Sequence, residues 1–296
     1  MSGANDRQLR SVSQAGARPN CAIIARCGRS SLVNRVSPNM AAPPFPIARK
    51  DLIDGLGKGL RVIEAFDDEH PRLSPSEAAQ RAGLTRTAAR RYLLSLCHFG
   101  YAGSDGKLFW LTPRVLRLGQ SYLGAARLPR LVQPFIQRAS MASGETVNVS
   151  VLDGHEVVYV ARSNAPRVVS IGYHVGARAP AHVATPGIVM VSALGDAELD
   201  AWLAAHDFHA FTAHTVSTAE VFREHVRAAR SLDHWITAQQ RDLGLSGIAT
   251  ALRDRKGVCK GAVGMTLQSV AYTPEQMRSQ LLPLLHEAAQ ALRPLL

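Results

Sequence analysis

The sequence predicts an α+β protein with a small helical module near its N-terminus and a larger domain built on an antiparallel sheet. Two observations lead to this prediction. Signals for a helix, a tight turn, a second helix and a hairpin follow one another between residues 74 and 110. Beyond residue 130, strand and helix patterns interleave to the C-terminus. With 296 residues, 46% of them hydrophobic, the chain has room for two domains.

The N-terminal module is predicted to begin with a helix over residues 56–66, where large apolar residues share one side. A second helix begins at Ser74, because its hydroxyl can accept from the backbone NH of Glu77 while the Glu77 carboxylate reaches back to the NH of Ser74. Pro75 suits the first helical position, where a missing NH costs nothing. Gly83 can take the left-handed conformation that ends a helix, so the following turn is tight.

A third helix is predicted from its cap, Thr85, to Gly100, with Leu93 and Leu96 turned inward. Its basic and polar side chains then point outward near its start, the end that contacts base edges in helix-turn-helix proteins. A hairpin with its turn at 104–107 follows and forms a wing. The residues predicted to contact DNA are Thr85, Arg86, Thr87, Arg90, Arg91 and Lys107.

A competing interpretation is that these arginines only form a solvated surface, as arginines on helix faces usually do. Capping boxes likewise occur in every class of helical protein. The wing and the local charge favour the DNA-binding interpretation, since Thr85 to Arg117 holds six basic residues and one acidic residue. The sequence therefore predicts a winged helix-turn-helix that binds double-stranded DNA.

The net charge of +11 is concentrated at the N-terminus, where residues 1–50 carry +7 of it. This segment has no sustained periodicity, and we expect a disordered basic tail. Three interpretations fit it: extra contacts with DNA phosphates, an organelle presequence, or a stretch that precedes a true translation start at Met40.

Between the two domains the sequence predicts a connecting helix, Arg114 to Gly124, whose apolar residues can pair with a second subunit. Thr112-Pro113 ends the wing before it, and Leu128-Pro129 is expected to break the helical pattern after it. The predicted divisions are a DNA-binding domain over 51–113, a linker helix over 114–128 and a second domain over 129–296.

The second domain is predicted to have an antiparallel core. Glu145 to Leu152 alternates as a strand, Asp153-Gly154 is a strong hairpin turn, and Glu156 to Ala161 returns as the partner strand. The remaining predicted elements are helices over 131–142, 197–205, 219–231 and 274–292, and strands over 168–171 and 261–267.

Composition excludes several other classes of protein. No apolar run approaches the ~20 residues of a membrane span, and no segment of signal-peptide type stands at the N-terminus. The cysteines show neither a CxxC pair nor regular spacing, so we expect neither a zinc module nor a disulfide framework. We expect a cytoplasmic protein without a metal, a cofactor or a membrane partner. The cysteines are Cys21, Cys27, Cys97 and Cys259.

Several segments carry the pattern of a known family. They are Gly83-Leu-Thr-Arg-Thr-Ala-Ala-Arg-Arg-Tyr-Leu-Leu94, Leu108-Phe-Trp-Leu-Thr-Pro-Arg-Val-Leu-Arg-Leu-Gly119, Val151-Leu-Asp-Gly154, Val158-Tyr-Val-Ala-Arg162 and Val175-Gly-Ala-Arg-Ala-Pro-Ala-His182. From about Gly57 to the C-terminus the chain resembles the isocitrate-lyase-regulator (IclR) family of bacterial transcription factors, most closely the branch that governs catabolism of aromatic acids such as protocatechuate and 4-hydroxybenzoate. The resemblance implies a GAF-like C-terminal domain that binds a small organic acid as effector, a homodimer or tetramer, and a palindromic operator.

The resemblance also implies where the effector binds. In relatives it sits in a cup beside the sheet, lined by the loop after the Val-Gly-x-Arg-x-Pro segment and by the segment that leads into the late strands. For His182, packing or a buried backbone hydrogen bond is the competing role, and Arg178 is either a structural fork or a carboxylate ligand. The implied effector-binding residues are His182, Thr185, Pro186, Gly187, Thr237, Gln240, Gly247, Ile248, Gly264 and Thr266.

The chain departs from the family pattern around this cup. Gln240 replaces an acidic residue before the Leu-Gly-Leu signature, and Ser246 replaces an arginine after it. Ala251 stands at a usual proline, and Gly264 at a usual late-strand asparagine. The loss of an acid and a base together changes the charge that the cup offers to a ligand.

Three functions fit these patterns. The leading prediction is a ligand-responsive DNA-binding transcriptional regulator of a catabolic operon for an aromatic or other organic acid. The alternative is an architectural DNA binder with a degenerate effector cup, which the altered cup residues favour. A small-molecule enzyme comes third, but no G-x-S-x-G, H-E-x-x-H or phosphate-binding glycine motif occurs, so we assign no catalytic residue.

Overall fold

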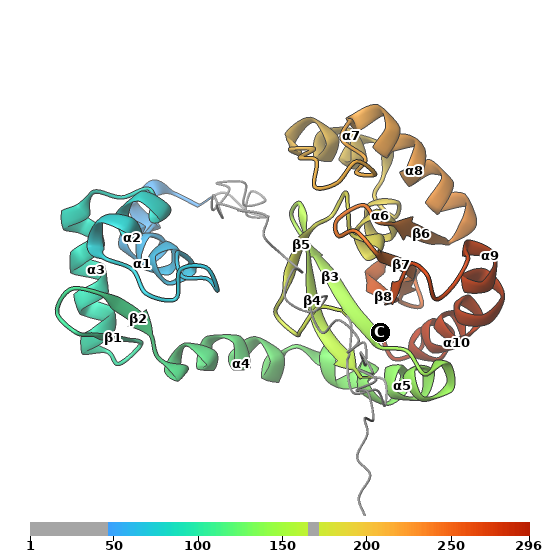
Figure 1. Cartoon of the computed structure of the whole chain (residues 1–296), viewed down its shortest axis with the longest axis horizontal. Coiled ribbons are helices and arrows are strands. Elements are labelled where there is room, and N and C mark those ends of the chain that lie inside the picture. The colour runs from blue at the N-terminus through green and yellow to red at the C-terminus, as the bar shows by residue number, and fades with distance from the viewer. Residues whose placement is uncertain (1–46, 165–171) are drawn as a thin grey trace, which may run out of the picture. The chain divides into compact units, whose positions relative to one another are not determined.

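The computed structural model describes residues 47–164 and 172–296 (Figure 1). Nearly all of the predicted basic tail, including Met40, lies outside the described residues, as does the predicted strand over 168–171. The N-terminal module and the C-terminal domain are described one after the other below.

Three helices and a hairpin make up the N-terminal module. The order of its elements is η1 Arg49–Asp51, α1 Asp54–Glu64, α2 Pro75–Ala82, α3 Arg86–His98, β1 Ala102–Ser104 and β2 Phe109–Leu111. The hairpin is antiparallel, with Ala102 opposite Leu111. The predicted winged helix-turn-helix is therefore confirmed.

Both predicted helix caps of the module are present. The backbone NH of Glu77 donates to Ser74 Oγ at 3.3 Å, and the NH of Ser74 donates to Glu77 Oε2 at 2.7 Å. Gly83 ends α2 with φ +65°, a left-handed conformation that favours glycine. The Thr85 hydroxyl accepts from the NH of Ala88 at 3.2 Å and caps α3. Because these signals are local in sequence, they fix the turn between α2 and α3 without help from distant residues.

The core of the module joins the wing to the helices. Small alanines on α2 and α3 are buried and let the two helices approach closely. Leu73 and Phe109 exchange two backbone hydrogen bonds at 2.9 Å, so the segment before α2 pairs with the second strand of the wing. The Phe109 side chain is buried in the same core. The wing is therefore held by both backbone pairing and side-chain packing.

Arg81 ties α2 to the segment that follows α1. Its Nε donates to the carbonyl oxygen of Ala65 at 2.6 Å, and its Nη2 pairs with Asp67 Oδ2. Nη1 lies 3.2 Å from His70 Nδ1, and the side chain is only 10% exposed. Burial raises the pKa of the Asp67 carboxyl, but hydrogen bonds from His70 and the charge of Arg81 outweigh it, so the net pKa lies below its ordinary value.

The predicted helix break at Leu128-Pro129 is wrong. A short η2 Pro113–Val115 leads into α4 Leu116–Ala125. The helical conformation is interrupted at Ala126, whose backbone is extended with ψ 125°. The next helix, α5, already begins at Arg127 and runs to Ser143, beyond both ends of the predicted 131–142. Pro129 falls in the first turn of α5, where the backbone NH groups have no partner within the helix, so a proline there removes no hydrogen bond.

The C-terminal domain contains one six-stranded antiparallel sheet, which confirms the predicted α+β fold. The strand order is β5-β4-β3-β8-β7-β6. The predicted hairpin is present, with Asp153 opposite Glu156 across a two-residue turn that contains Gly154. The strands are β3 Val147–Asp153, β4 Glu156–Ser163, β5 Arg178–Pro180, β6 His234–Ala238, β7 Leu245–Arg253 and β8 Cys259–Gln268.

Helices cover both faces of this sheet (Figure 1). Alternate strand residues such as Val149 and Val263 pack against α5 and the C-terminal helices, whereas Ala249 and Ala262 face the opposite helical layer. The layers consist of α5 with α9 Pro274–Gln276, the π turn Met277–Leu281 and α10 Leu282–Leu292, and of α6 Thr185–Val191, α7 Asp196–Ala205 and α8 Ala219–Leu232. Helix α6 and strands β5, β6 and β7 were not predicted from the sequence.

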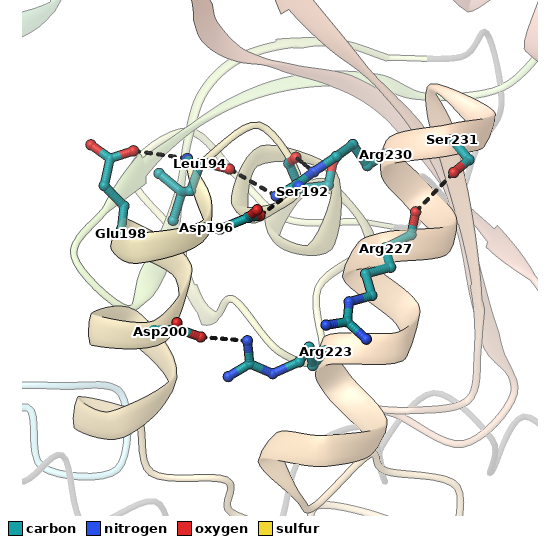
Figure 2. Close-up of polar contacts among 10 residues, drawn as sticks. Ser192, Leu194, Asp196, Glu198, Asp200, Arg223, Arg227, Arg230 and Ser231 are labelled. Atoms are coloured by element: carbon teal, nitrogen blue, oxygen red, sulfur yellow. Dashed lines mark hydrogen bonds and ion pairs between the residues drawn. The ribbon is translucent and has the colours of Figure 1, made fainter.

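A set of polar contacts joins α8 to the start of α7 (Figure 2). Arg230 donates to the carbonyl oxygens of Ser192 and Leu194, each at 2.9 Å, and to Asp196 Oδ1 at 2.8 Å. Arg223, two turns earlier on α8, pairs with Asp200 of α7. These contacts fix the outer helices over the sheet face that carries the cavity described below.

Replacement of Arg81 by methionine should destabilise the N-terminal module, because it removes the donor of the Ala65 carbonyl and the cation that pairs with the Asp67 carboxylate. We expect the free energy of unfolding to fall by about 2 kcal/mol. Denaturant unfolding followed by circular dichroism measures it. Arg90→Met, on an exposed position of α3, is the matched control and should change stability little.

Candidate nucleic-acid interface and ligand cavity

The polar residues predicted to contact DNA lie on the exposed side of α3. Arg86, Thr87, Arg90 and Arg91 are exposed, whereas Ala89 on the opposite side is fully buried. Arg86 and Arg90 are four residues apart and share one face of the helix, as do Thr87 and Arg91. Within the described part of the chain, none of the three arginines forms an ion pair, so their donors are available to an anion.

The wing presents Lys107 at its tip. Asp105 Oδ1 accepts from the backbone NH groups of Lys107 and Leu108 at 3.0 and 2.8 Å, and Gly106 takes φ +95°. These backbone hydrogen bonds also lower the pKa of the Asp105 carboxyl. The turn is thus fixed while the Lys107 side chain stays exposed. It has no ion pair among the described residues and can reach a phosphate.

A further cation beside the wing was missed by the sequence analysis. The guanidinium of Arg72 lies over the Trp110 ring, 4.4 Å from its centroid, and 3.7 Å from Asp105 Oδ2. No periodic pattern marked it, because it stands in the loop before α2. The loop brings Arg72 to the wing because Leu73, next in sequence, pairs with Phe109.

A cavity that is partly open to solvent lies between the sheet and the start of α6; together with its solvent-filled mouth it spans about 510 Å³. Its walls come from β3, β4, α6, β6, β7, β8 and the loop between β6 and β7. Eight of the ten residues that the resemblance implied for the effector line it, although they come from four separate stretches of chain. They are Thr185, Pro186, Thr237, Gln240, Gly247, Ile248, Gly264 and Thr266.

His182 and Gly187, the other two, do not line the cavity. Gly187 lies against the backbone of Ala181, where an added Cβ would stand 2.6 Å from the Cα of that residue. It therefore allows the close approach of α6 to the turn that follows β5. Arg178 lies outside the cavity as well, since it donates to Glu156 Oε2 and Asp153 Oδ2, each at 2.7 Å, as a structural fork.

His182 belongs to a relay of three histidines. Its Nε2 lies 3.0 Å from the carbonyl oxygen of His209 and must donate to it. His182 Nδ1 then accepts from His206 Nε2 at 2.7 Å, and His206 Nδ1 accepts from His155 Nδ1 at 3.1 Å. One arrangement of protons satisfies every contact with all three rings neutral. Trp202 stacks on His206 with ring centroids 4.3 Å apart.

The segment that follows the relay is also fixed at its other end. Thr212 Oγ1 donates to the carbonyl oxygen of Gln239 at 2.7 Å, and Thr215 Oγ1 donates to that of Gln240 at 2.6 Å. The backbone of a cavity residue, Gln240, is thereby connected through residues 206–215 to the histidine relay.

Residues that the sequence analysis did not assign complete the cavity. Asn148, Tyr159, Tyr173 and Arg241 are the polar ones with the most distinctive chemistry. Asn148 and Ser150 alternate with valines on β3, and both are almost fully buried. Polar residues at alternate positions of a strand that is buried on both faces are a signal that can be recognised in sequence. Arg241 lies in a loop and carries no such signal.

Four buried polar atoms in the cavity wall have no hydrogen-bond partner among the described residues. They are Nδ2 and Oδ1 of Asn148, Oε1 of Gln240 and Nη1 of Arg241. Asn148 is 3% exposed and Gln240 is 8% exposed. An unmet buried polar group costs about 1–3 kcal/mol, so native proteins rarely carry several in one place. The wall offers both donors and acceptors to a bound molecule.

Tyr173 supports Arg241 at the edge of the cavity. The Arg241 guanidinium lies 4.7 Å from the centroid of the Tyr173 ring, which stacks on Tyr159 at 4.6 Å. The Tyr173 hydroxyl donates to Asp242 Oδ2 at 3.1 Å. Burial raises the pKa of Tyr173 to about 12, so the phenol stays protonated at neutral pH and keeps this hydrogen bond.

The close packing of β8 against β7 explains why position 264 is a glycine. An added Cβ would stand 2.6 Å from the carbonyl oxygen of Ile248 and 2.8 Å from the Cβ of Ala249, so a side chain does not fit there without movement of β7. In the register of β3 with β8, Asn148 lies directly opposite Gly264. At this point of the cavity wall an amide side chain therefore comes from β3, and none comes from β8.

Residues 47–164 and 172–296 contain no group of histidines, cysteines and carboxylates arranged to hold a metal ion. No helix in these ranges has the length and apolarity needed to cross a membrane.

Two family models match the chain, and together they cover most of it. Residues 55–106 match the IclR helix-turn-helix domain, and residues 120–293 match the C-terminal domain of the bacterial transcriptional regulator IclR.

Individual proteins similar to this chain are transcriptional regulators as well. The p-hydroxybenzoate hydroxylase transcriptional activator of Acinetobacter baylyi is 38% identical over 252 residues, which cover 83% of this chain and 93% of that protein. A crystal structure from Rhodococcus sp. RHA1, assigned as a transcriptional regulator, is 36% identical with a TM-score of 0.69, covering 81% of this chain and 96% of that one. The inducer-binding domain of a PobR double mutant from Acinetobacter, in complex with 3-hydroxybenzoic acid, is 32% identical with a TM-score of 0.55; the match covers 58% of this chain and all of that domain.

The histidine relay should make the stability of the C-terminal domain depend on pH. Burial, reinforced by His182 and His155, lowers the pKa of His206 to about 3. Because the unfolded chain binds this proton near pH 6.5, stability should be unaffected above that pH. It should fall as the pH drops from about 6.5 towards 3, by up to about 1.4 kcal/mol per pH unit.

Unfolding measured between pH 7.5 and 5 tests this prediction through its slope with pH. His206→Gln should flatten the slope, whereas His214→Gln, at an exposed position of the same segment, should leave it unchanged. Equal slopes for the wild-type chain and His206→Gln would show that the relay is not the source.

Proposed function

The chain belongs to the IclR family of bacterial transcriptional regulators, and we propose that it controls a catabolic operon in response to a small aromatic or other organic acid. The effector would occupy the cavity of the C-terminal domain. The exposed face of α3 would enter the major groove of DNA, with Lys107 of the wing on a phosphate. We assign DNA binding to residues 51–113, the linker to 114–128 and effector binding to 129–296.

The unmet polar atoms of the cavity carry the effector proposal. A cup kept only for assembly would gain from apolar residues at positions 148 and 240, because each unpaired buried group lowers stability. The chain instead holds Asn148 and Gln240 there, with their polar atoms unpaired among the described residues. This arrangement favours a cavity that is completed by a ligand over the architectural alternative.

An acid with an attached hydroxyl group suits this wall best. Arg241 Nη1 and Asn148 Nδ2 are donors that match a carboxylate. Gln240 Oε1 and Asn148 Oδ1 are acceptors, which a carboxylate cannot satisfy and a hydroxyl can. The relatives point to the same chemistry, since one is named for p-hydroxybenzoate hydroxylase and another was crystallised with 3-hydroxybenzoic acid.

We also propose a homodimer or tetramer that binds a palindromic operator. Two recognition helices would then lie about ten base pairs apart, or a multiple of that. The proposal is supported by exposed apolar side chains on and before α1 and on α4, which are costly to leave in water. These are Ile53, Leu56, Leu60, Leu116, Leu118 and Tyr122. A cytoplasmic location is proposed with it, because the chromosome is the proposed partner.

Catalysis is not part of the proposal. The family models and the relatives reported above are regulators. We propose that the cavity binds its ligand without converting it, and release of a modified aromatic acid by the purified chain would contradict this.

Calorimetry on the purified full chain tests the effector. Hydroxylated benzoates, such as 4-hydroxybenzoate and 3,4-dihydroxybenzoate, should bind at least about five times more tightly than benzoate, because benzoate leaves the acceptor oxygens unpaired. Asn148→Leu should reduce that preference, and Arg278→Ala, outside the cavity, should not. No heat from any aromatic or short-chain acid, together with intact operator binding, would favour the architectural alternative.

Binding to DNA is tested with duplexes that the chain selects from its host genome. Arg86→Ala or Arg90→Ala should weaken binding to the selected duplex by ~1–3 kcal/mol relative to random DNA, if each reads a guanine. Lys107→Ala should weaken both duplexes alike, because phosphates carry no sequence information. Fluorescence anisotropy gives both affinities. Equal losses on the two duplexes for Arg86→Ala and Arg90→Ala would contradict base reading.

A further inference from the structure

We propose that Arg241 binds the carboxylate of the effector and sets the preference of this chain for an anionic over a neutral ligand. The inference rests on the proposed function, because it requires that the cavity binds an effector at all. It goes further in assigning the recognition of charge to one side chain.

Arg241 is the single lysine or arginine in the described wall of the cavity. Its Nη1 is buried and has no hydrogen-bond partner among the described residues. The neighbouring carboxylate, Asp242, approaches only the Nε side, with Oδ2 at 3.9 Å, which is beyond hydrogen-bond distance. Arg241 Nη1 is therefore available to a second carboxylate.

Tyr173 positions this guanidinium. The centroid of its ring lies 4.7 Å from the guanidinium carbon of Arg241, and its hydroxyl donates to Asp242 Oδ2 at 3.1 Å. The main chain of Tyr173 is fixed in turn, because Arg162 Nη1 donates to the carbonyl oxygens of Gly172 and Tyr173 at 3.1 and 2.8 Å. A cation that is held over an aromatic ring loses little freedom when an anion binds, which favours affinity.

The charges of the cavity wall support the same assignment. Gln240 and Ser246 line the cavity beside Arg241, and both are uncharged. The hydroxyl of Ser246 pairs with that of Ser269, with 2.7 Å between the two oxygens. With Gln240 uncharged, no carboxylate at that position competes with an acidic ligand for Arg241.

A pair of isosteric ligands isolates the charge. The probes are 4-hydroxybenzoate and 4-hydroxybenzamide, which differ in charge and little in shape, titrated into the wild-type chain by calorimetry. We expect the acid to bind at least about tenfold more tightly than the amide. Arg241→Met should bring the ratio of the two affinities close to one, and Arg241→Lys should keep part of it. Arg253→Met, a partly buried arginine of β7 outside the cavity, is the control and should leave the ratio unchanged.

The outcomes separate this inference from the proposed function. If the wild-type chain binds neither probe nor any other acid, the effector proposal fails and the inference fails with it. If it binds 4-hydroxybenzoate but Arg241→Met retains the acid-to-amide ratio, the inference alone is overturned. Equal affinity of the wild-type chain for the two probes overturns it too. Thermal unfolding of each variant, measured alongside, identifies a variant that fails to fold, and Arg241→Gln then replaces it.

A second pair of variants tests the role of Tyr173. Tyr173→Phe keeps the ring beneath the guanidinium and should preserve most of the acid-to-amide ratio. Tyr173→Ala removes the ring and should lower the ratio as well as the affinity. A general structural role would lower the affinity for both probes equally, so an unchanged ratio in Tyr173→Ala would contradict a positioning role.

Discussion

Helices cover both faces of the six-stranded sheet, and the chemistry of the C-terminal domain depends on this burial. A polar side chain on such a sheet is out of reach of bulk water and must find a partner within the protein or in a bound molecule. Thr250 finds one, since its hydroxyl donates to the carbonyl oxygen of Asp233 at 2.7 Å. Asn148 finds none among the described residues. This contrast distinguishes a side chain that builds the framework from one that we propose binds the effector.

The N-terminal module shows the opposite arrangement, because the side chains that we propose contact DNA are exposed to water. Alanines between α2 and α3 keep the helices close and leave the core to a few larger residues such as Leu93 and Phe109. Arg81 is mostly buried and stabilises the module, whereas Arg86 and Arg90 remain exposed on α3. The difference lies in position on the helices: the guanidinium of Arg81 reaches a carbonyl and a carboxylate, and the others point outward.

Sequence reasoning succeeded where the signals were local. The caps at Ser74 and Thr85 and the turn at Gly154 depend on residues within a few positions, and all three are as predicted. It failed for β7, because a strand buried on both faces lacks the alternation that marks a half-buried strand. It failed for β6, a short strand at the edge of the sheet, because its burial does not alternate. Arg241, a loop residue, was not predicted as a cavity residue for a different reason. Its place in the cavity depends on contacts with Tyr173, 68 positions earlier in the numbering, which no local pattern reveals.

The segment from His206 to Thr215 has one end in the histidine relay and the other on the backbone of Gln240. A segment that is held at both ends has little conformational freedom. The backbone of the cavity wall at Gln240 is therefore braced from outside the sheet, and it needs little further ordering when a molecule enters.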